Sequence, residues 1–302
     1  MIKSQSKRKN MGIKERVTAR VVDLFSHSER PLQNTEKYEG DPGLFGPGSI
    51  SWEVLGDVSS FVGGIRALLI QAAHPEVAAG VADHSSYRED PLGRLSRTAY
   101  YVTSMTYGAM PETEEAISMV NFAHRRVSGV SERGRAYSAS SPEYSAWVHN
   151  TLTNSFLEAF QVFKRPVTEI EADQFVSEQA LIGERMGADP LPKTAQELKE
   201  WVNSHPDLAD SKALREAIEF LKNPPLSKTE SIGYRILQRA AATTIEPDLR
   251  MLLGLRSSKL NLLMGKLLIR GLRWALKYSP SWKAALIRSK ADFDSKLFRS
   301  DV

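Results

Sequence analysis

The sequence predicts an all-α fold in which a single large multi-helix domain carries most of the chain. Apolar residues recur at three- and four-residue spacing in one segment after another, whereas convincing alternation of apolar and polar residues is missing. Proline and glycine divide these segments into many short helices. The 302 residues, 41% hydrophobic and 25% charged, suit a globular protein with a sizeable core.

The chain begins with a basic, polar extension (residues 1–34) that we expect to be partly disordered. Residues 41–49 are rich in glycine and proline and predict a shaped loop. Residues 62–73 are apolar on almost every side, which indicates a buried helix. Pro75 should end that helix, because its ring clashes with the preceding turn, and it suits the first position of the next helix.

Asp90 and Pro91 repeat this pattern as N-cap and first residue of a helix that should reach about residue 105. The following helix should begin at Pro111 and end near Gly129, its predicted C-terminal cap. Its inner face consists of Ile117, Val120, His124 and Val127. Further helices are predicted from residue 142, over 169–186, 194–202, 212–221 and 232–244, and from residue 247 to beyond 255.

The segment from Arg256 to Lys290 contains nine Lys or Arg residues and no acidic residue, interspersed with leucines. A basic amphipathic helix of this kind either packs on the domain with its basic side in water or lies on an anionic membrane surface. We favour the first interpretation, because leucine-rich amphipathic helices usually pack. We therefore divide the chain into the extension, a domain over 35–255, and basic amphipathic helices over 256–302 that are packed on that domain.

The composition excludes several kinds of site. The sequence has no cysteine, which excludes disulfides, thiolate zinc sites, iron–sulfur clusters and covalently attached c-type haem. The 40 basic and 36 acidic residues are nearly balanced, so no nucleic-acid partner is expected. The first 20 residues lack the apolar core of a secretory signal, and no apolar run of about 18 residues is present to span a membrane. We therefore expect a cytoplasmic protein.

His124 lies within the apolar stripe of its predicted helix and is followed by Arg125 and Arg126. A neutral imidazole in such a place is either satisfied inside the core or ligates a metal, and the spacing alone favours the core. A haem needs one proximal imidazole and nearby cations for its propionates. The two arginines are compatible with a haem and equally with a solvated helix face.

Arg94, Arg97 and Thr98 are spaced at i, i+3 and i+4, which places them on one side of one helix. Thr98 shares the apolar stripe of that helix, which directs the group toward the interior. Guanidinium groups there need anionic partners or a hydrated cavity. They would either orient oxygen or a substrate carbonyl or carboxylate, or form ion pairs with Asp83, Glu89 or Asp90.

The other histidines give weaker signals. His149 is the second candidate for an axial or distal position, although its spacing favours a core residue. An iron site of two histidines and one carboxylate, with Glu76 or Glu158 as oxygen ligand, stays open. No His-x-x-x-His or Glu-x-x-His pair supports such a site.

His74 is more readily explained as a cap of the helix that begins at Pro75, and His27 and His205 lie in polar stretches to which we assign no role. The sequence contains no GxSxG elbow, P-loop or GxGxxG turn. The hydrolase, NTPase and dinucleotide-binding classes therefore lose their usual support.

Taken together and in order, several motifs resemble a known family. They lie at residues 43–49, 63–69, 74–81, 94–98, 124–129 and 149–152. The chain resembles the DUF2236 family, also called the MpaB/rubber oxygenase family, over roughly residues 40–255. Characterised members are all-helical and hold a non-covalent haem b on one proximal histidine. They include latex-clearing proteins, which cleave the double bonds of polyisoprene with dioxygen, and a fungal enzyme that shortens a farnesyl chain.

The resemblance implies a set of site residues. His124 is similar to the proximal ligand and is therefore the expected metal ligand. We assign Arg125, Arg66 and His149 to cofactor binding as well.

The catalytic residues implied by the resemblance are Arg94, Arg97 and Thr98, which fall on the family's distal Arg-x-x-Lys-Thr pattern. Arg97 stands where the latex-clearing proteins have lysine. A lysine amine can lose its proton and bind iron, whereas a guanidinium keeps its proton. A resting state in which this side chain ligates the iron is therefore not expected here.

The implied function is that of a haem b-dependent oxygenase or oxidase. It would act with dioxygen on an apolar, isoprenoid- or lipid-like substrate in a buried haem cavity. The alternative is a haem- or lipid-binding protein without turnover. A third interpretation is a protein that contacts a membrane peripherally through residues 256–290.

Overall fold

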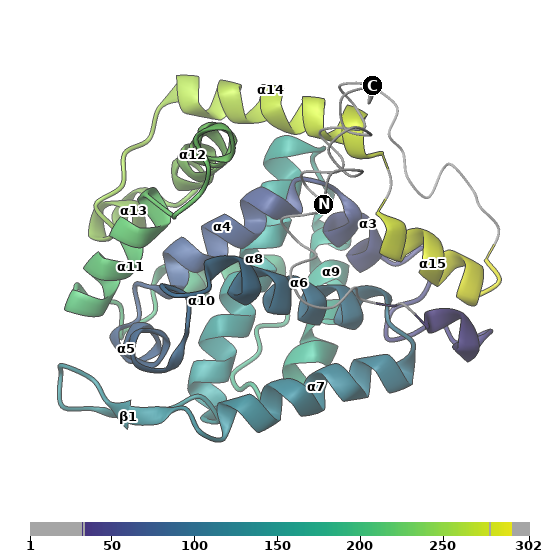
Figure 1. The fold of residues 1–302 in the computed structure, drawn as a ribbon, viewed down its shortest axis with the longest axis horizontal. Helices are drawn as coiled ribbons and strands as arrows, with labels where there is room; N and C mark the ends of the chain where they lie inside the picture. The colour runs from purple at the N-terminus through teal and green to yellow at the C-terminus, as the bar shows by residue number, and fades with distance from the viewer. Residues whose placement is uncertain (1–31, 33, 278, 292–302) are drawn as a thin grey trace, which may run out of the picture.

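The computed structural model describes residues 32, 34–277 and 279–291, so nearly all of the predicted basic extension lies outside the described residues. The described part contains thirteen α-helices, one 3-10 helix and one small hairpin, which confirms the predicted all-α fold (Figure 1). The elements are η1 (Thr35–Tyr38), α3 (Ile50–Gly56), α4 (Ser60–Gln71), α5 (Pro75–His84), α6 (Pro91–Tyr107), α7 (Met110–His124), β1 (Ser128–Val130), β2 (Ala136–Ser138), α8 (Pro142–Phe163), α9 (Glu169–Arg185), α10 (Ala195–Asn203), α11 (Lys212–Lys222), α12 (Lys228–Thr243), α13 (Pro247–Leu252), α14 (Lys259–Leu276) and α15 (Pro280–Arg288).

Helices α4 and α8 form the centre of the molecule and pack against each other more extensively than any other pair. Gly63 permits this close approach: a Cβ atom there would lie 2.7 Å from Cδ1 of Phe156 and 3.1 Å from the backbone oxygen of Ser155. On its other side α4 contacts α12, which in turn supports α14. The core around α4 and α8 is built from leucine, isoleucine, valine and aromatic side chains.

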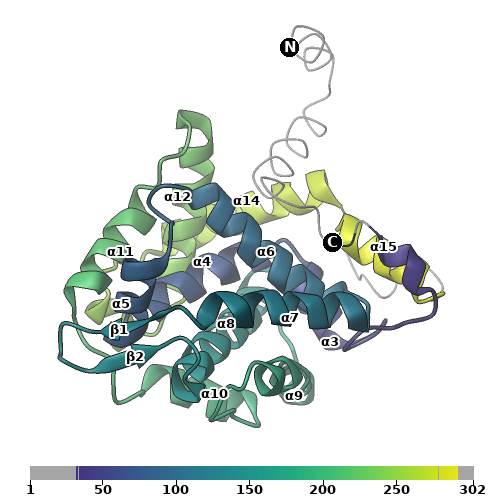
Figure 2. The same ribbon diagram turned by 60° about the horizontal axis from the view of Figure 1, so that its bottom comes forward.

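Helices α6 and α7 pack against each other and lie in front of this core (Figure 2). A small cluster made by Met105, Ala116 and Ile182 joins α6 and α7 to the end of α9. The β-hairpin follows α7 directly and packs on α5. α7 therefore ends beside the hairpin, whereas the segment just before α6 is joined to α11, since Arg88 donates to Oε2 of Glu216 at 2.7 Å.

The helix starts predicted at proline residues agree with the structure, whereas the helix predicted from residue 232 begins at Lys228. Pro75, Pro91 and Pro142 each occupy the first position of a helix, where the missing N–H costs no hydrogen bond. Asp90 caps α6, because its Oδ1 accepts the backbone N–H of Gly93 at 2.9 Å.

Two predicted helix ends are wrong. α7 ends at His124 rather than near Gly129, because Ser128–Val130 pairs with β2 and takes its backbone hydrogen bonds there. Gly129 faces Tyr137 in that ladder, and a Cβ atom on it would lie 2.5 Å from the tyrosine hydroxyl. α13 ends at Leu252 instead of continuing past residue 255. The short helix α3 had no prediction of its own.

The basic segment forms α14 and α15, each fixed by one arginine. Arg273 binds both carboxylate oxygens of Asp57, at 2.7 and 2.8 Å, and thereby ties α14 to the loop before α4. Arg288 is fully buried and donates to Thr35 Oγ1 and to the backbone oxygens of Asp41 and Tyr107. Among the described helices, none combines the length and the hydropathy needed to cross a bilayer.

Candidate functional site

His124 occupies the last position of α7, and its side chain is half-buried. Among the described residues, none forms a hydrogen bond with its ring. Burial lowers the pKa of this imidazole, and the positive charge of Arg94 lowers it further. His124 is therefore a neutral imidazole, and its unprotonated ring nitrogen has a lone pair available for metal coordination.

Arg94 and Thr98 lie one turn apart on α6 and are bound to each other. Nη1 of Arg94 donates to Oγ1 of Thr98 at 2.5 Å, and that hydroxyl donates to the backbone oxygen of Arg94 at 3.1 Å. Burial lowers the pKa of Arg94, and no carboxylate of the described chain forms an ion pair with it. α6 thus carries a cation without an anionic partner among the described residues, bound to a hydroxyl, and its charge acts on the neutral imidazole at the end of α7.

Arg97 differs from its two neighbours on α6. Its side chain is 52% exposed, and Nη1 lies 3.4 Å from Oδ2 of Asp90 while Nη2 donates to Oγ of Ser86 at 3.2 Å. Arg97 therefore follows the alternative in which it forms an ion pair with Asp90. These contacts hold the guanidinium on the outer side of the helix start.

Arg66 and Arg125 lie in different surroundings. Arg66 is fully buried between α4 and α8, where Nη1 donates to Oδ1 of Asn154 at 2.8 Å and to Oγ of Ser155 at 2.9 Å. Burial lowers its pKa to about 10. Arg125 is exposed just after α7, and its guanidinium lies 5.8 Å from the ring centre of Phe122. The assignment of both to cofactor binding stays a prediction.

His149 lies in α8 with its ring against α9. A Cβ atom on Gly183 would be 3.0 Å from Nε2 of this imidazole, and the Oγ1 atom of Thr153 lies 3.5 Å from the same nitrogen. Burial lowers the pKa of His149 to about 4, so the ring is neutral near pH 7. Ile182, which precedes Gly183 on α9, packs against α6 and α7. α9 therefore lies between His149 and these two helices.

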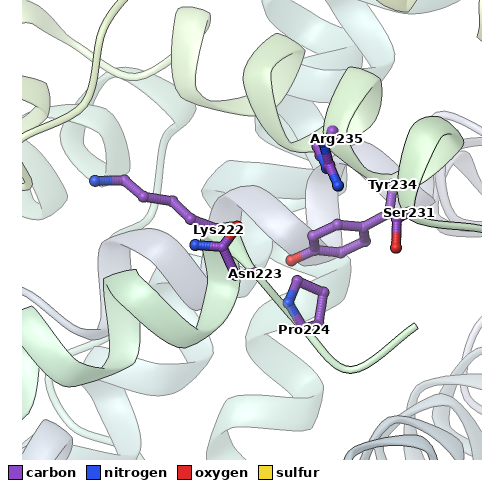
Figure 3. A pocket seen from close by; sticks show the side chains of 6 residues that line it. All are labelled: Lys222, Asn223, Pro224, Ser231, Tyr234 and Arg235. Atoms are coloured by element: carbon purple, nitrogen blue, oxygen red, sulfur yellow. The ribbon is translucent and has the colours of Figure 1, made fainter. Parts of the chain in front are cut away.

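A small pocket lies where α11 ends and α12 begins (Figure 3). Its volume is about 90 Å³, and it contains none of the residues predicted from the sequence. Its lining residues are Lys222, Asn223, Pro224, Ser231, Tyr234 and Arg235. Because the Tyr234 hydroxyl already donates to the backbone oxygen of Leu221 at 2.8 Å, we assign this pocket no chemistry.

A second group of ionisable side chains surrounds the start of α5. His74 is the N-cap residue of that helix, as expected, but its side chain forms no capping hydrogen bond. Instead its ring lies beside Glu76 and beside His205, with Asp207 close by. His205 had no predicted role, although the His-Pro-Asp sequence at 205–207 places two potential ligands two residues apart.

Comparison with known proteins gives one family. The model of the family described as "ER-bound oxygenase mpaB/B'/Rubber oxygenase, catalytic domain" matches residues 52–276. No curated protein and no solved structure matches the chain. The matched range covers α4 to α14 and therefore includes His124, Arg94, Thr98 and the cluster at His74.

Proposed function

The chain belongs to the mpaB/rubber oxygenase family, a family of oxygenase catalytic domains, and we propose that it is a haem b-dependent oxygenase or oxidase. One observation in the matched region supports this most directly. The half-buried imidazole of His124, which no described residue hydrogen-bonds, lies within the electrostatic influence of Arg94, and the Arg94–Thr98 pair has no carboxylate partner among the described residues.

The residues present fit a haem. Haem iron takes a neutral imidazole as proximal ligand, and burial together with Arg94 keeps His124 neutral. A haem also carries two propionates that need cations, and Arg94 has no carboxylate of its own among the described residues. In this proposal His124 ligates the iron, and the guanidinium of Arg94 balances the negative charge nearby.

When bound, the haem supplies iron chemistry that activates dioxygen. The chain supplies hydrogen-bond donors and a low-dielectric environment. Thr98 donates its hydroxyl proton to the carbonyl of its own helix turn, which leaves the oxygen lone pair aimed at Arg94 and fixes that guanidinium. A fixed donor costs little reorganisation when charge develops on a substrate or on oxygen. Arg97 acts in this proposal only after leaving Asp90.

We further propose that the substrate is apolar, isoprenoid- or lipid-like, and that the protein meets it at the anionic, cytoplasmic surface of a membrane. The support comes from α14. One face of this helix packs on α12, where Gly265 lies against Ala240. The opposite face is also apolar and lies in solvent. It carries Leu260, Leu263, Met264 and Leu267, which are 42–65% exposed.

The residues beside this exposed stripe are positively charged, which indicates a negatively charged partner. Lys259, Lys266 and Arg270 lie along one flank of it and are exposed. The sequence contains no acidic residue between residues 249 and 291. Apolar side chains that enter the headgroup boundary, with cations beside them, match an anionic lipid surface better than a neutral protein surface.

The test of the cofactor is reconstitution of the full chain with haemin, followed by an absorption spectrum. We expect a Soret band that the His124→Ala variant loses and that exogenous imidazole restores. The matched control is His84→Ala, which removes an exposed histidine from the end of α5. A wild-type protein without a Soret band, or a His124→Ala variant with an unchanged one, contradicts the proposal.

A measurement of oxygen uptake distinguishes the oxygenase from the alternative, a haem- or lipid-binding protein without turnover. A carrier binds haem but consumes no oxygen with unsaturated lipids under reducing conditions, whereas an oxygenase consumes oxygen. In Arg94→Ala the oxygenase should lose this activity per bound haem, measured at neutral pH and corrected for the Soret band that the variant retains.

A further inference from the structure

The cluster at the start of α5 contains a buried histidine that lacks a hydrogen bond. The side chain of His74 is 1% exposed, and neither of its ring nitrogens has a hydrogen-bond partner. A buried polar group without a partner destabilises the fold, so such a nitrogen calls for a ligand. The nearest charged atom is Oε2 of Glu76, 3.4 Å from Nδ1.

Two further ligand-type side chains point at the same place. One nitrogen of His74, one of His205 and one carboxylate oxygen of Asp207 all lie within 4.8 Å of one another. The ring centres of His74 and His205 are 5.4 Å apart. The three residues come from the start of α5 and from the irregular segment between α10 and α11, so the fold itself brings them together.

Aromatic rings enclose the two imidazoles. The ring of Tyr144 lies 5.3 Å from that of His74, and the ring of Trp201 lies 4.8 Å from that of His205. Trp147 contacts both histidines, at 5.7 and 5.1 Å. Burial and the neighbouring His205 lower the pKa of His74 to about 4, so this imidazole is neutral and able to donate a lone pair.

We propose that His74, His205 and Asp207 bind one divalent transition-metal ion of the Zn²⁺ type, separate from the site at His124. Two imidazoles and one carboxylate are a ligand set that zinc accepts, with a fourth position left for water. Glu76 serves as the outer partner that accepts a proton from Nδ1 of His74 and turns its other nitrogen toward the metal.

The geometry requires a small contraction. Ligand atoms at about 2.0–2.2 Å from a tetrahedral ion lie about 3.4 Å apart, so the three side chains must move inward by roughly 1 Å. His205 and Asp207 can make this movement, because both are half-buried and lie outside regular secondary structure. Among the residues that the structure describes, the ring of His205 forms one hydrogen bond, and it is long: Nδ1 accepts the N–H of Asp207 at 3.3 Å.

The charges around the cluster come from two arginines. Arg133 binds both oxygens of Glu76 and lies 3.7 Å from Oδ1 of Asp207. Arg135 binds the same Oδ1 atom. These cations hold the carboxylates in place, and Arg135 also competes with a metal for Asp207.

Equilibrium dialysis of the chelator-treated full chain against Zn²⁺, with elemental analysis, tests the proposal. We expect one zinc per chain, with affinity at least tenfold weaker in His205→Ala and in Asp207→Asn, and tenfold to a hundredfold weaker in Glu76→Gln. Arg135→Gln is the discriminating variant: removal of the competing cation should keep or raise the affinity. If Asp207 acts only through its ion pair, Arg135→Gln weakens zinc binding as Asp207→Asn does.

Zinc that is absent from the wild-type chain, or bound equally by the variant His205→Ala/Asp207→Asn, overturns the proposal. Circular dichroism identifies any variant that fails to fold, and the isosteric Asp207→Asn is the substitution least disturbing to folding. His84→Gln is the control for zinc held by an exposed histidine. The result is independent of the haem proposal, because zinc is counted as an element and the Soret band is recorded in the same samples.

Discussion

Burial and the guanidinium of Arg94 on α6 together lower the pKa of the imidazole of His124 on α7. The two residues are 30 positions apart in the sequence, and the helices that carry them pack against each other. The electrostatic effect has a direct chemical meaning. A proton and a metal compete for the same nitrogen, so a nearby cation that repels the proton keeps the ligand available at lower pH.

Substitution of Arg94 should make haem binding more sensitive to acid. In Arg94→Gln the pKa of His124 rises toward its ordinary value, because only burial then opposes protonation. The pH at which half the Soret band is lost on acidification should therefore be higher than in the wild-type protein. Arg97→Gln is the control on the same helix, and its midpoint should stay at the wild-type value. An unchanged or lower midpoint in Arg94→Gln would disprove this electrostatic role.

The buried state of His149 should contribute to acid denaturation. Its pKa is about 4 in the folded chain against an ordinary value of 6.5, so the unfolded chain binds more protons between these two values. The contribution of His149 to the free energy of unfolding is fully present above pH 6.5. It is lost as the pH falls toward 4, and the loss is at most about 3 kcal/mol. In His149→Phe, urea unfolding at pH 4.5 and pH 7 should differ by less than in the wild-type protein. An equal difference in both proteins would show that another group controls this range.

Two adjacent glycines of α4 give a matched test of the central packing. Gly63→Ala should lower the free energy of unfolding by about 1–3 kcal/mol, because the new Cβ atom overlaps Phe156. Gly64→Ala meets nothing within 4 Å and should raise stability by up to about 1 kcal/mol through helix propensity. Urea unfolding measures both. Equal effects of the two substitutions would mean that α4 and α8 do not approach each other in this way.

The exposed face of α14 should determine membrane binding. Leu263→Ser combined with Leu267→Ser should reduce co-sedimentation with vesicles of phosphatidylserine and phosphatidylcholine at least tenfold. Ile170→Ser is the control, because it removes an 81% exposed apolar side chain from α9. Binding of the wild-type protein should weaken with salt and with neutral vesicles. Vesicle binding that is independent of lipid charge would contradict the proposed role of anionic lipid. Self-association that the double substitution abolishes would mean that this face of α14 binds a second copy of the chain instead of a membrane.

The helix starts and the overall class could be predicted because they depend on local chemistry. Pro91 after Asp90, for example, sets a helix start whatever packs against it. The end of α7 could not be predicted, since Gly129 is a good helix terminator in sequence but is used in a ladder whose partner, Tyr137, lies beyond a turn. Register between such short strands depends on tertiary contacts.

The site was predictable in part for the same reason. The spacing of Arg94 and Thr98 on one helix face follows from periodicity, and their hydrogen bond agrees with it. The outward ion pair of Arg97 depends on where Asp90 caps the helix. The contact of His74 with His205 joins segments that are 131 positions apart, and no local pattern could indicate it.

The buried side chain of Arg288 has a practical meaning for anyone who shortens this protein. It joins the last described helix to Thr35, Asp41 and Tyr107, and Trp282 of the same helix fills the space beside Trp52. Deleting the carboxyl-terminal segment to test its affinity for lipid would therefore strip the cover from an aromatic cluster near the other end of the chain. Such a fragment would bind vesicles through core residues that the deletion exposes. Surface substitutions in the full-length protein are therefore needed to distinguish specific membrane binding from the effect of partial unfolding.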